Sequence, residues 1–184
     1  MFRGLCSLYS EPGRTYHNID HIAAMLDIVS RFEDLLHEPL EVRLAIWFHD
    51  YIYDARRQDN EEQSALYVTV IFDGEQWALL RPRLTELILA TKTHQARWGD
   101  TDCQLLLDAD LAVLGSPPEE YDAYAAAIRK EYAWVPEADY PAGRVGVLQG
   151  FLNRDRLYGT NALFLSLEQP ARANLSREIA WLSR

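Results

Sequence analysis

Cysteine is scarce in this chain, with only Cys6 and Cys103 among 184 residues. Because no Cys-x-x-Cys pair exists, neither a thiolate zinc site nor a disulfide framework is expected, and a reducing compartment fits. No apolar run approaches the ~20 residues that a membrane-spanning helix needs. The first residues also lack the charged and then apolar pattern of a signal peptide. The sequence therefore predicts a cytoplasmic protein with no membrane partner.

Basic residues are few as well. The chain has 18 Lys and Arg against 28 Asp and Glu, a formal net charge of −10. Binding to a phosphate backbone needs a basic face, so no nucleic-acid polymer is expected as a partner. A small phosphorylated ligand remains compatible, because a metal ion in an acidic pocket can reverse the local field.

Internal repeats and low-complexity linkers are also absent, and 48% of the residues are hydrophobic. These features predict one globular domain that spans residues 1–184. Apolar residues recur every three to four positions nearly throughout, which is typical of amphipathic helices. The predicted helices cover residues 19–32, 39–48, 60–72, 82–91, 105–114, 118–132, 145–152 and 172–182. The one β-branched run, 68–72, lies inside a helical pattern, so we predict a compact all-α fold of roughly eight helices.

Two short motifs contain histidines. The first is Tyr-His-Asn-Ile-Asp-His at 16–21, where His17 and His21 are spaced to lie one turn apart on one helix face. Both imidazoles could bind one metal ion, or one could bind the metal while the other faces a ligand on it. The alternative is a histidine that caps a helix or forms a hydrogen bond in the core. The second motif is His49-Asp50, directly after the apolar run 44–48. A carboxylate there is costly to bury unless it is paired or metal-bound, and the alternative is a solvated helix end.

A third motif places two acids in an apolar segment. Asp108 and Asp110 flank one alanine within residues 105–114, and His94 lies between this motif and His49-Asp50. Acids in so apolar a helix need partners. The alternative is one exposed aspartate and one that caps a helix or forms a salt bridge.

In chain order these motifs read His, His-Asp and Asp, all on predicted helices. This order resembles the HD-domain superfamily of metal-dependent phosphohydrolases, specifically its small bacterial members. Segments 58–65, 90–94, 128–132 and 171–175 also look like that group. The resemblance implies a ligand set for one divalent ion (Mn, Fe, Co, Ni, Zn or Mg), which consists of His21, His49, Asp50 and Asp110.

The string Tyr-His-Asn-x-x-His is also similar to one in the cyclic-nucleotide phosphodiesterases. That likeness implies that His17 is the general acid, and an unperturbed histidine pKa near ~6.5 suits the role. The chain departs from related patterns because Tyr-Ile-Tyr follows His49-Asp50, where many HD proteins have Ile-Gly-Lys. No further histidine follows soon, as it does in the phosphodiesterases. A second ion would therefore need His94 or an acid such as Asp54 or Glu61.

Other charged residues are candidates for supporting roles. Glu61 and Glu62 would act as a general base or bond to ligand histidines, or they are acids favoured by a helix N-terminus. Lys92, Arg129 and Arg172 would bind phosphate oxygens, or they are surface charges.

The expected activity is hydrolysis of a phosphate ester or anhydride in a nucleotide or other small phosphorylated metabolite. Metal-activated water would attack, Asp50 or Asp110 would orient it, and His17 would protonate the leaving group. Two alternatives stay open on the same fold, a metal- and ligand-binding regulatory protein without turnover and a di-iron oxygenase. A homo-oligomer is compatible with the sequence.

Overall fold

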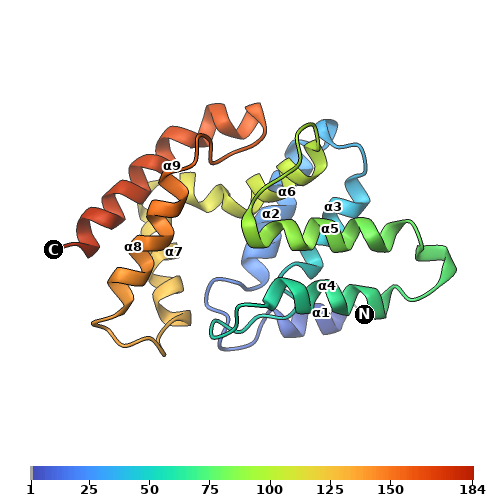
Figure 1. Ribbon diagram of the computed structural model, residues 1–184, viewed down its shortest axis with the longest axis horizontal. Coiled ribbons are helices and arrows are strands. Elements are labelled where there is room, and N and C mark those ends of the chain that lie inside the picture. The colour runs from blue at the N-terminus through green and yellow to red at the C-terminus, as the bar shows by residue number, and fades with distance from the viewer. Residues whose placement is uncertain (1) are drawn as a thin grey trace. The chain divides into compact units, whose positions relative to one another are not determined.

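The described residues form α-helices and short 3₁₀ turns that are joined by loops. The computed structural model describes residues 2–184, with side chains described from residue 4 onward. Helical residues make up 69% of the chain, and the described residues contain no strand, which confirms the predicted all-α class. The nine α-helices of this part belong to two compact units, Met1–Asp110 and Leu111–Arg184 (Figure 1).

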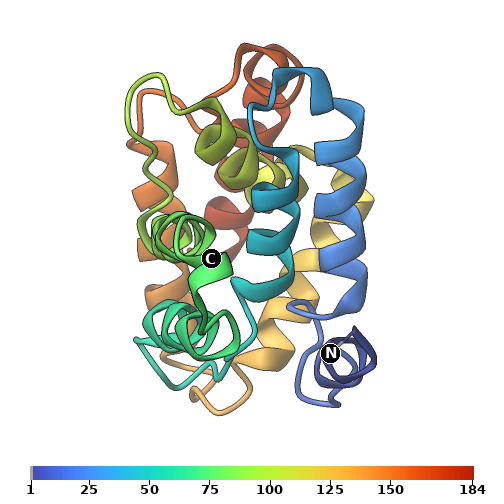
Figure 2. The ribbon, with the colours of Figure 1, turned by 90° about the vertical axis from the view of Figure 1, so that its right-hand side faces the viewer.

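The first unit is built around α3. Its helices are α1 (Phe2–Leu8), α2 (Ile19–Arg31), α3 (Pro39–Phe48), α4 (Asn60–Ile71), α5 (Leu80–Thr93) and α6 (Thr101–Leu111), with 3₁₀ turns η1 (Glu33–Leu35) and η2 (Glu75–Trp77). Figure 2 shows α3 between α2 and α5, and α4 packs along α5. The core side chains of these helices recur at helical spacing. They include Ile22, Met25 and Val29 of α2, Val42, Ala45 and Ile46 of α3, and Leu84, Leu87 and Ile88 of α5.

Two side chains bond to backbone N–H groups near the starts of helices in this unit. The Asn18 side-chain oxygen accepts the backbone N–H groups of Asp20 and His21 at 2.9 and 3.3 Å, so α2 begins at Ile19. The Asp102 carboxylate of α6 accepts the N–H groups of His37 and Glu38 at 2.7 and 3.0 Å. This contact ties the start of α6 to the residues that precede α3.

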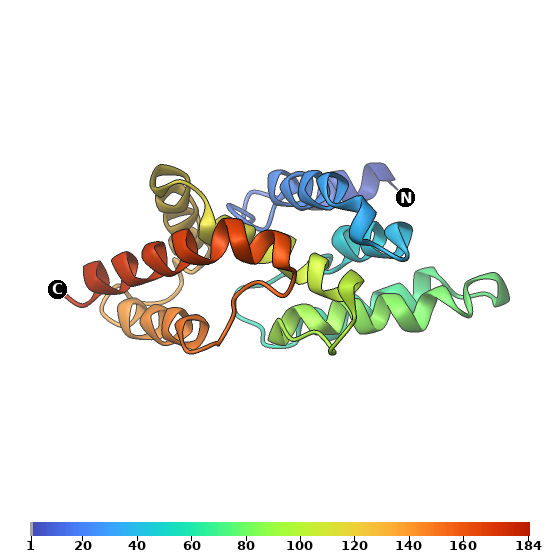
Figure 3. The same ribbon diagram turned by 90° about the horizontal axis from the view of Figure 1, so that it is seen from above.

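The second unit packs around its last helix. It contains the 3₁₀ turn η3 (Ala112–Gly115), α7 (Pro118–Glu131), α8 (Tyr140–Leu152) and α9 (Asn161–Leu182). Figure 3 shows α8 alongside α9, and η3 also packs on α9. A Cβ atom on Gly115 would lie 2.7 Å from the Leu167 Cβ, so only glycine allows this approach. The Asn174 amide donates to the carbonyls of Leu114 and Ser116, both at 2.9 Å, which satisfies the end of η3.

Several predicted boundaries are wrong. The fourth predicted helix begins at Leu80 rather than Pro82, because a proline within the first turn removes an N–H that has no intrahelical partner. The last helix begins at Asn161, capped by Thr160, and continues through Pro170 rather than beginning at residue 172. The predicted helix 105–114 changes to a 3₁₀ turn after Leu111. The short helix α1 was not predicted.

None of the helices among residues 2–184 combines the length and the apolar character required to traverse a bilayer.

Candidate metal centre

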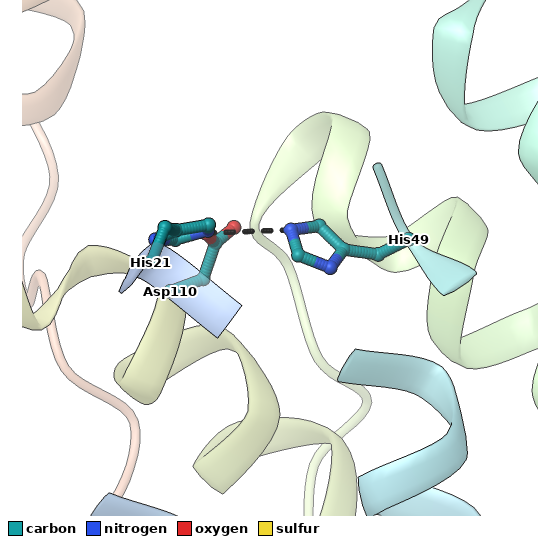
Figure 4. A group of neighbouring side chains, drawn as sticks. All are labelled: His21, His49 and Asp110. Atoms are coloured by element: carbon teal, nitrogen blue, oxygen red, sulfur yellow. Dashed lines mark ion pairs between the residues drawn. The ribbon is translucent and has the colours of Figure 1, made fainter. Parts of the chain in front are cut away.

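Three side chains from separate helices converge at one point of the first unit. His21, His49 and Asp110 each offer one ligand atom, and these atoms lie within 4.8 Å of one another. The His21 Nε2 atom is 3.2 Å from Asp110 Oδ1, and the His49 Nε2 atom is 3.8 Å from the same oxygen. Figure 4 shows the three side chains pointing toward one another. These residues are three of the four implied metal ligands.

Each residue reaches this point from a helix end. His21 lies in the first turn of α2, where its own N–H bonds to Asn18. His49 follows α3 as its C-terminal cap, and Asp110 lies in the last turn of α6. Three separate elements therefore each bring one side chain to the same point.

Asp50 lies beside this group. Its side chain is buried, and its Oδ2 atom is 3.0 Å from the His49 Nε2 atom. Because α3 ends at Phe48, the adjacent side chains of His49 and Asp50 need not diverge as they would inside a helix. A fourth ligand role for Asp50 stays a prediction.

The two imidazoles have buried nitrogens without hydrogen bonds. Within the described part of the chain, neither His21 Nε2 nor His49 Nε2 has a hydrogen-bond partner, although carboxylate oxygens lie 3.2 and 3.0 Å away. The distances are short, but the directions are wrong for N–H donation. The His49 Nδ1 atom donates to the Ile46 carbonyl at 2.9 Å, so the neutral ring has its lone pair on Nε2. Buried nitrogens of this kind fit a cation that takes both lone pairs.

The charges of the centre depend strongly on one another. Burial lowers the pKa of His49, but the Asp50 and Asp110 carboxylates outweigh it and raise this pKa to about 9. Burial raises the pKa of Asp50, yet His49, His17 and His21 hold it well below its usual range. For Asp110, burial is likewise outweighed by His21, His94 and His49, which hold its pKa low. Both carboxyl groups are therefore ionised at neutral pH, as metal ligands must be.

His94 contacts the other oxygen of Asp110. Its Nε2 atom lies 3.0 Å from Asp110 Oδ2, so the two oxygens of this carboxylate face different imidazoles. His94 ends α5 with φ 50° and ψ 47°, the only left-handed backbone among the described non-glycine residues. Such a conformation costs on the order of 1 kcal/mol and persists where surrounding contacts determine it. The contact orients Asp110, and a second-metal role for His94 stays a prediction.

Asp54, another candidate for a second ion, is engaged in a turn. Its side chain is exposed, and its carboxylate accepts the Arg56 N–H at 2.9 Å. The Asn60 side-chain nitrogen donates to the Asp54 carbonyl at 3.0 Å, and the Asn60 Oδ1 atom accepts from the Asp54 N–H at 3.1 Å. Asp54 is not part of the group that His21, His49 and Asp110 form.

His17 is near the centre, but not in the predicted way. The prediction that His17 and His21 share a helix face is wrong, because Asn18 caps α2 and leaves His17 before the helix. The two rings still lie 5.9 Å apart between centroids. The His17 ring stacks on Tyr53 at 4.2 Å with an interplanar angle of 28°. A half-buried imidazole therefore lies next to the ligand group without belonging to it.

Arg14 was missed by sequence reasoning. Its buried guanidinium donates to the carbonyls of His17 and Asp50 at 3.3 and 2.7 Å and to that of Tyr51 at 2.9 Å. It also lies over the Tyr53 ring, 5.6 Å from the centroid. These bonds join the segment before α2 to the turn after α3. A single arginine in a loop has no spacing pattern that would have indicated this burial.

The remaining residues that were predicted to act as a base or to bind phosphate are divided between the two units: Glu61 and Lys92 belong to the first, Arg129 and Arg172 to the second. Glu61 is half-buried in the first turn of α4, and the Lys92 ammonium bonds to the Gln58 carbonyl and to Glu62. Arg129 and Arg172 belong to the second unit. Both guanidinium groups donate to backbone carbonyls, of Tyr132 and Val135 for Arg129 and of Leu152, Arg154 and Asp155 for Arg172. A phosphate-binding role for Lys92, Arg129 or Arg172 stays a prediction.

The donor set limits the chemistry of the centre. Two imidazoles and one carboxylate suit a divalent first-row ion, and three protein ligands leave coordination positions open. Comparisons with protein-family models, curated proteins and solved structures found no significant match.

Proposed function

We propose that this protein is a metal-dependent phosphohydrolase that acts on a phosphate ester or anhydride of a nucleotide or similar small metabolite. The observation that supports it most is the pair of buried, unbonded nitrogens of His21 and His49 beside the Asp110 carboxylate. The order of these residues along the chain, with Asp50 next to His49, also resembles the HD-domain superfamily.

His21, His49 and Asp110 would hold the ion, and Asp50 would complete the set. A divalent ion bound there would polarise a phosphoryl oxygen and make water easier to deprotonate. The Asp50 carboxylate, ionised at neutral pH, would accept a hydrogen bond from the attacking water and orient it.

His17 would give a proton to the leaving oxygen. It lies beside His21 but outside the ligand group, so its ring nitrogens are not needed for the ion. Tyr53 stacks on its ring and Arg14 bonds to its carbonyl, and together these contacts hold the imidazole in place. A held imidazole suits proton transfer near neutral pH.

The test is phosphate release that depends on an added metal. Metal-free protein would be loaded with Mn²⁺, Fe²⁺, Co²⁺, Ni²⁺, Zn²⁺ or Mg²⁺ and incubated with nucleotides and other phosphate monoesters and diesters. We expect phosphate release with at least one ion, and no release after Asp110→Asn. The control is Asp122→Asn, which changes an exposed carboxylate that pairs with Arg177 and should behave as wild type. Tight metal binding without turnover on any substrate would instead favour the regulatory alternative.

Oxidation at a di-iron centre is the second candidate function. It is favoured by the two Asp110 oxygens, which face different imidazoles and would suit a carboxylate that bridges two ions. Visible absorption and oxygen uptake by iron-loaded protein would distinguish it from the first proposal.

A further inference from the structure

The second unit contains a cavity that the proposed activity does not use. It has a volume of about 660 Å³ and lies between α7, the connection 132–139, the start of α8 and the end of α9. Small-molecule pockets are typically about 300–1,000 Å³. The cavity is therefore large enough for a small organic ligand.

Most of the lining is apolar. Ala125 and Ala126 of α7 leave space that larger side chains would fill, and Tyr140, Trp181 and Leu182 supply aromatic and aliphatic surface. The Trp181 side chain is 68% exposed although it is the largest apolar group of the lining. An exposed indole beside a cavity is typical of a surface that a ligand covers.

Two of the carboxylates at this cavity are already neutralised. Glu178 pairs with the buried Arg144, whose Nε atom lies 2.8 Å from its Oε1 atom. Asp122 pairs with Arg177 at 2.7 Å. Each of these carboxylates has a cation of its own, so the two pairs add no net charge to the cavity.

Two cations at the cavity are not neutralised. No ion pair among residues 4–184 includes Arg129 or Lys130, and one unpaired carboxylate, the exposed Glu137, lies opposite them in the lining. Arg129 lies 4.4 Å from the Tyr140 ring centroid and donates to the carbonyls of Tyr132 and Val135. A guanidinium has five N–H groups, so donors remain for an anion.

We propose that this cavity binds a small amphiphilic anion. Its apolar part would lie against Tyr140, Trp181 and Leu182, and its carboxylate or phosphate would bond to Arg129 and Lys130. The proposal requires no metal ion, so it stands or fails independently of the phosphohydrolase activity.

Calorimetric titration of the metal-free full chain tests the charge preference with four probes of equal chain length: octanoate, octyl phosphate, octanol and octylamine. We expect the two anions to bind one per chain, about tenfold or more tighter than octanol, with octylamine weakest. Arg129→Met should weaken this preference severalfold, because one of the two cations is lost, and it should leave octanol binding unchanged; an undiminished preference would also overturn the proposal. The matched control is Arg31→Met, which removes an exposed arginine of α2.

A second variant tests the cavity itself, because Arg129 also bonds to the carbonyls after α7 and its loss could disturb folding. Ala126→Phe fills the space and keeps both cations, so it should weaken binding of every probe about tenfold or more. Equal affinities for all four probes, no binding of the anions, or unchanged affinity in Ala126→Phe would each overturn the proposal. So would self-association of the chain that Ala126→Phe abolishes, since a second copy would then fill the cavity.

Discussion

At the scale of single residues, the centre depends on where two imidazole nitrogens point. The Nε2 atoms of His21 and His49 lie close to carboxylate oxygens without hydrogen-bond geometry, while His49 Nδ1 is held by the Ile46 carbonyl. A buried polar atom left unpaired costs roughly 1–3 kcal/mol. A cation between the two nitrogens and Asp110 would remove that cost. Binding of a cation would therefore explain why the fold keeps two unpaired nitrogens in a buried place.

Replacing His17 and His21 separately distinguishes the acid from the ligand. His17→Ala should keep its metal content and lose roughly 10²–10⁴-fold in turnover, because the leaving oxygen loses its proton donor. The loss should be smaller for a nitrophenyl ester, whose leaving group hardly needs a proton. His21→Ala should lose metal and activity together. Elemental analysis and phosphate-release rates measure both, and equal metal loss in the two variants would contradict the division of roles.

Bound metal should cancel the pH dependence of stability that His49 causes. The pKa of His49 is raised from 6.5 to about 9 in the folded protein, so its contribution to the free energy of unfolding is complete below pH 6.5. That contribution is lost as the pH rises through about 9, and metal-free protein should become less stable over this interval. Metal needs the neutral ring, so the stabilisation by metal should grow over the same interval.

Thermal unfolding across this pH range, with and without metal, checks both trends. His49→Gln should show neither the fall of metal-free stability with pH nor the growth of the stabilisation by metal. The difference in unfolding free energy between wild type and this variant separates His49 from the other titrating groups. His37→Gln, which changes a histidine outside the site, should keep both trends. Metal-free stability that is flat, or that rises toward pH 9, would show that the two carboxylates do not hold a proton on His49.

At the scale of elements, the start of α2 is coupled to the centre. Asn18→Ala removes the bonds to the N–H groups of Asp20 and His21 and should cost about 0.5–2 kcal/mol of stability. It should also weaken metal binding, because His21 lies in the turn that Asn18 caps. Thr160→Ala removes the cap of α9 in the second unit and should lower stability without changing metal affinity. Equal affinities in the two variants would show that the cap does not position His21.

Helices and the histidine–aspartate group were predictable from sequence to different degrees. Apolar spacing found the helix interiors, since Ile22 and Val29 of the predicted stripe of α2 are buried. His49 and Asp110 stood out as polar residues beside apolar runs, whereas the choice of His21 as a ligand came from the resemblance to the HD-domain superfamily. Helix ends were harder, because caps such as Asn18 and Thr160 act through local backbone geometry.

The surroundings of the centre were the least predictable. Arg14 is buried by contacts with residues 36 and 37 positions away, and sequence spacing has no information on such contacts. The left-handed backbone of His94 is likewise determined by packing rather than by residue type. The same limit applies to His17, whose contact with Tyr53 joins loops before α2 and after α3.

At the scale of the whole molecule, metal binding should stabilise the native chain. The three ligand residues are 28 and 61 positions apart along the sequence (49 − 21 and 110 − 49), so an unfolded chain does not hold them together. Metal at about 100 times its Kd should add about 2.7 kcal/mol to the free energy of unfolding. Asp110→Asn should abolish this gain, whereas Asp122→Asn should keep it. Chemical denaturation at fixed metal concentration measures the effect, and a full gain in Asp110→Asn would exclude Asp110 as a ligand.

Anomalous X-ray diffraction from crystals loaded with Zn²⁺ or Mn²⁺ would locate the metal ion directly. We expect a peak at the absorption edge of the metal, about 2.0–2.3 Å from the Nε2 atoms of His21 and His49 and from an Asp110 oxygen. A metal ion found elsewhere, with these three side chains left uncoordinated, would contradict it.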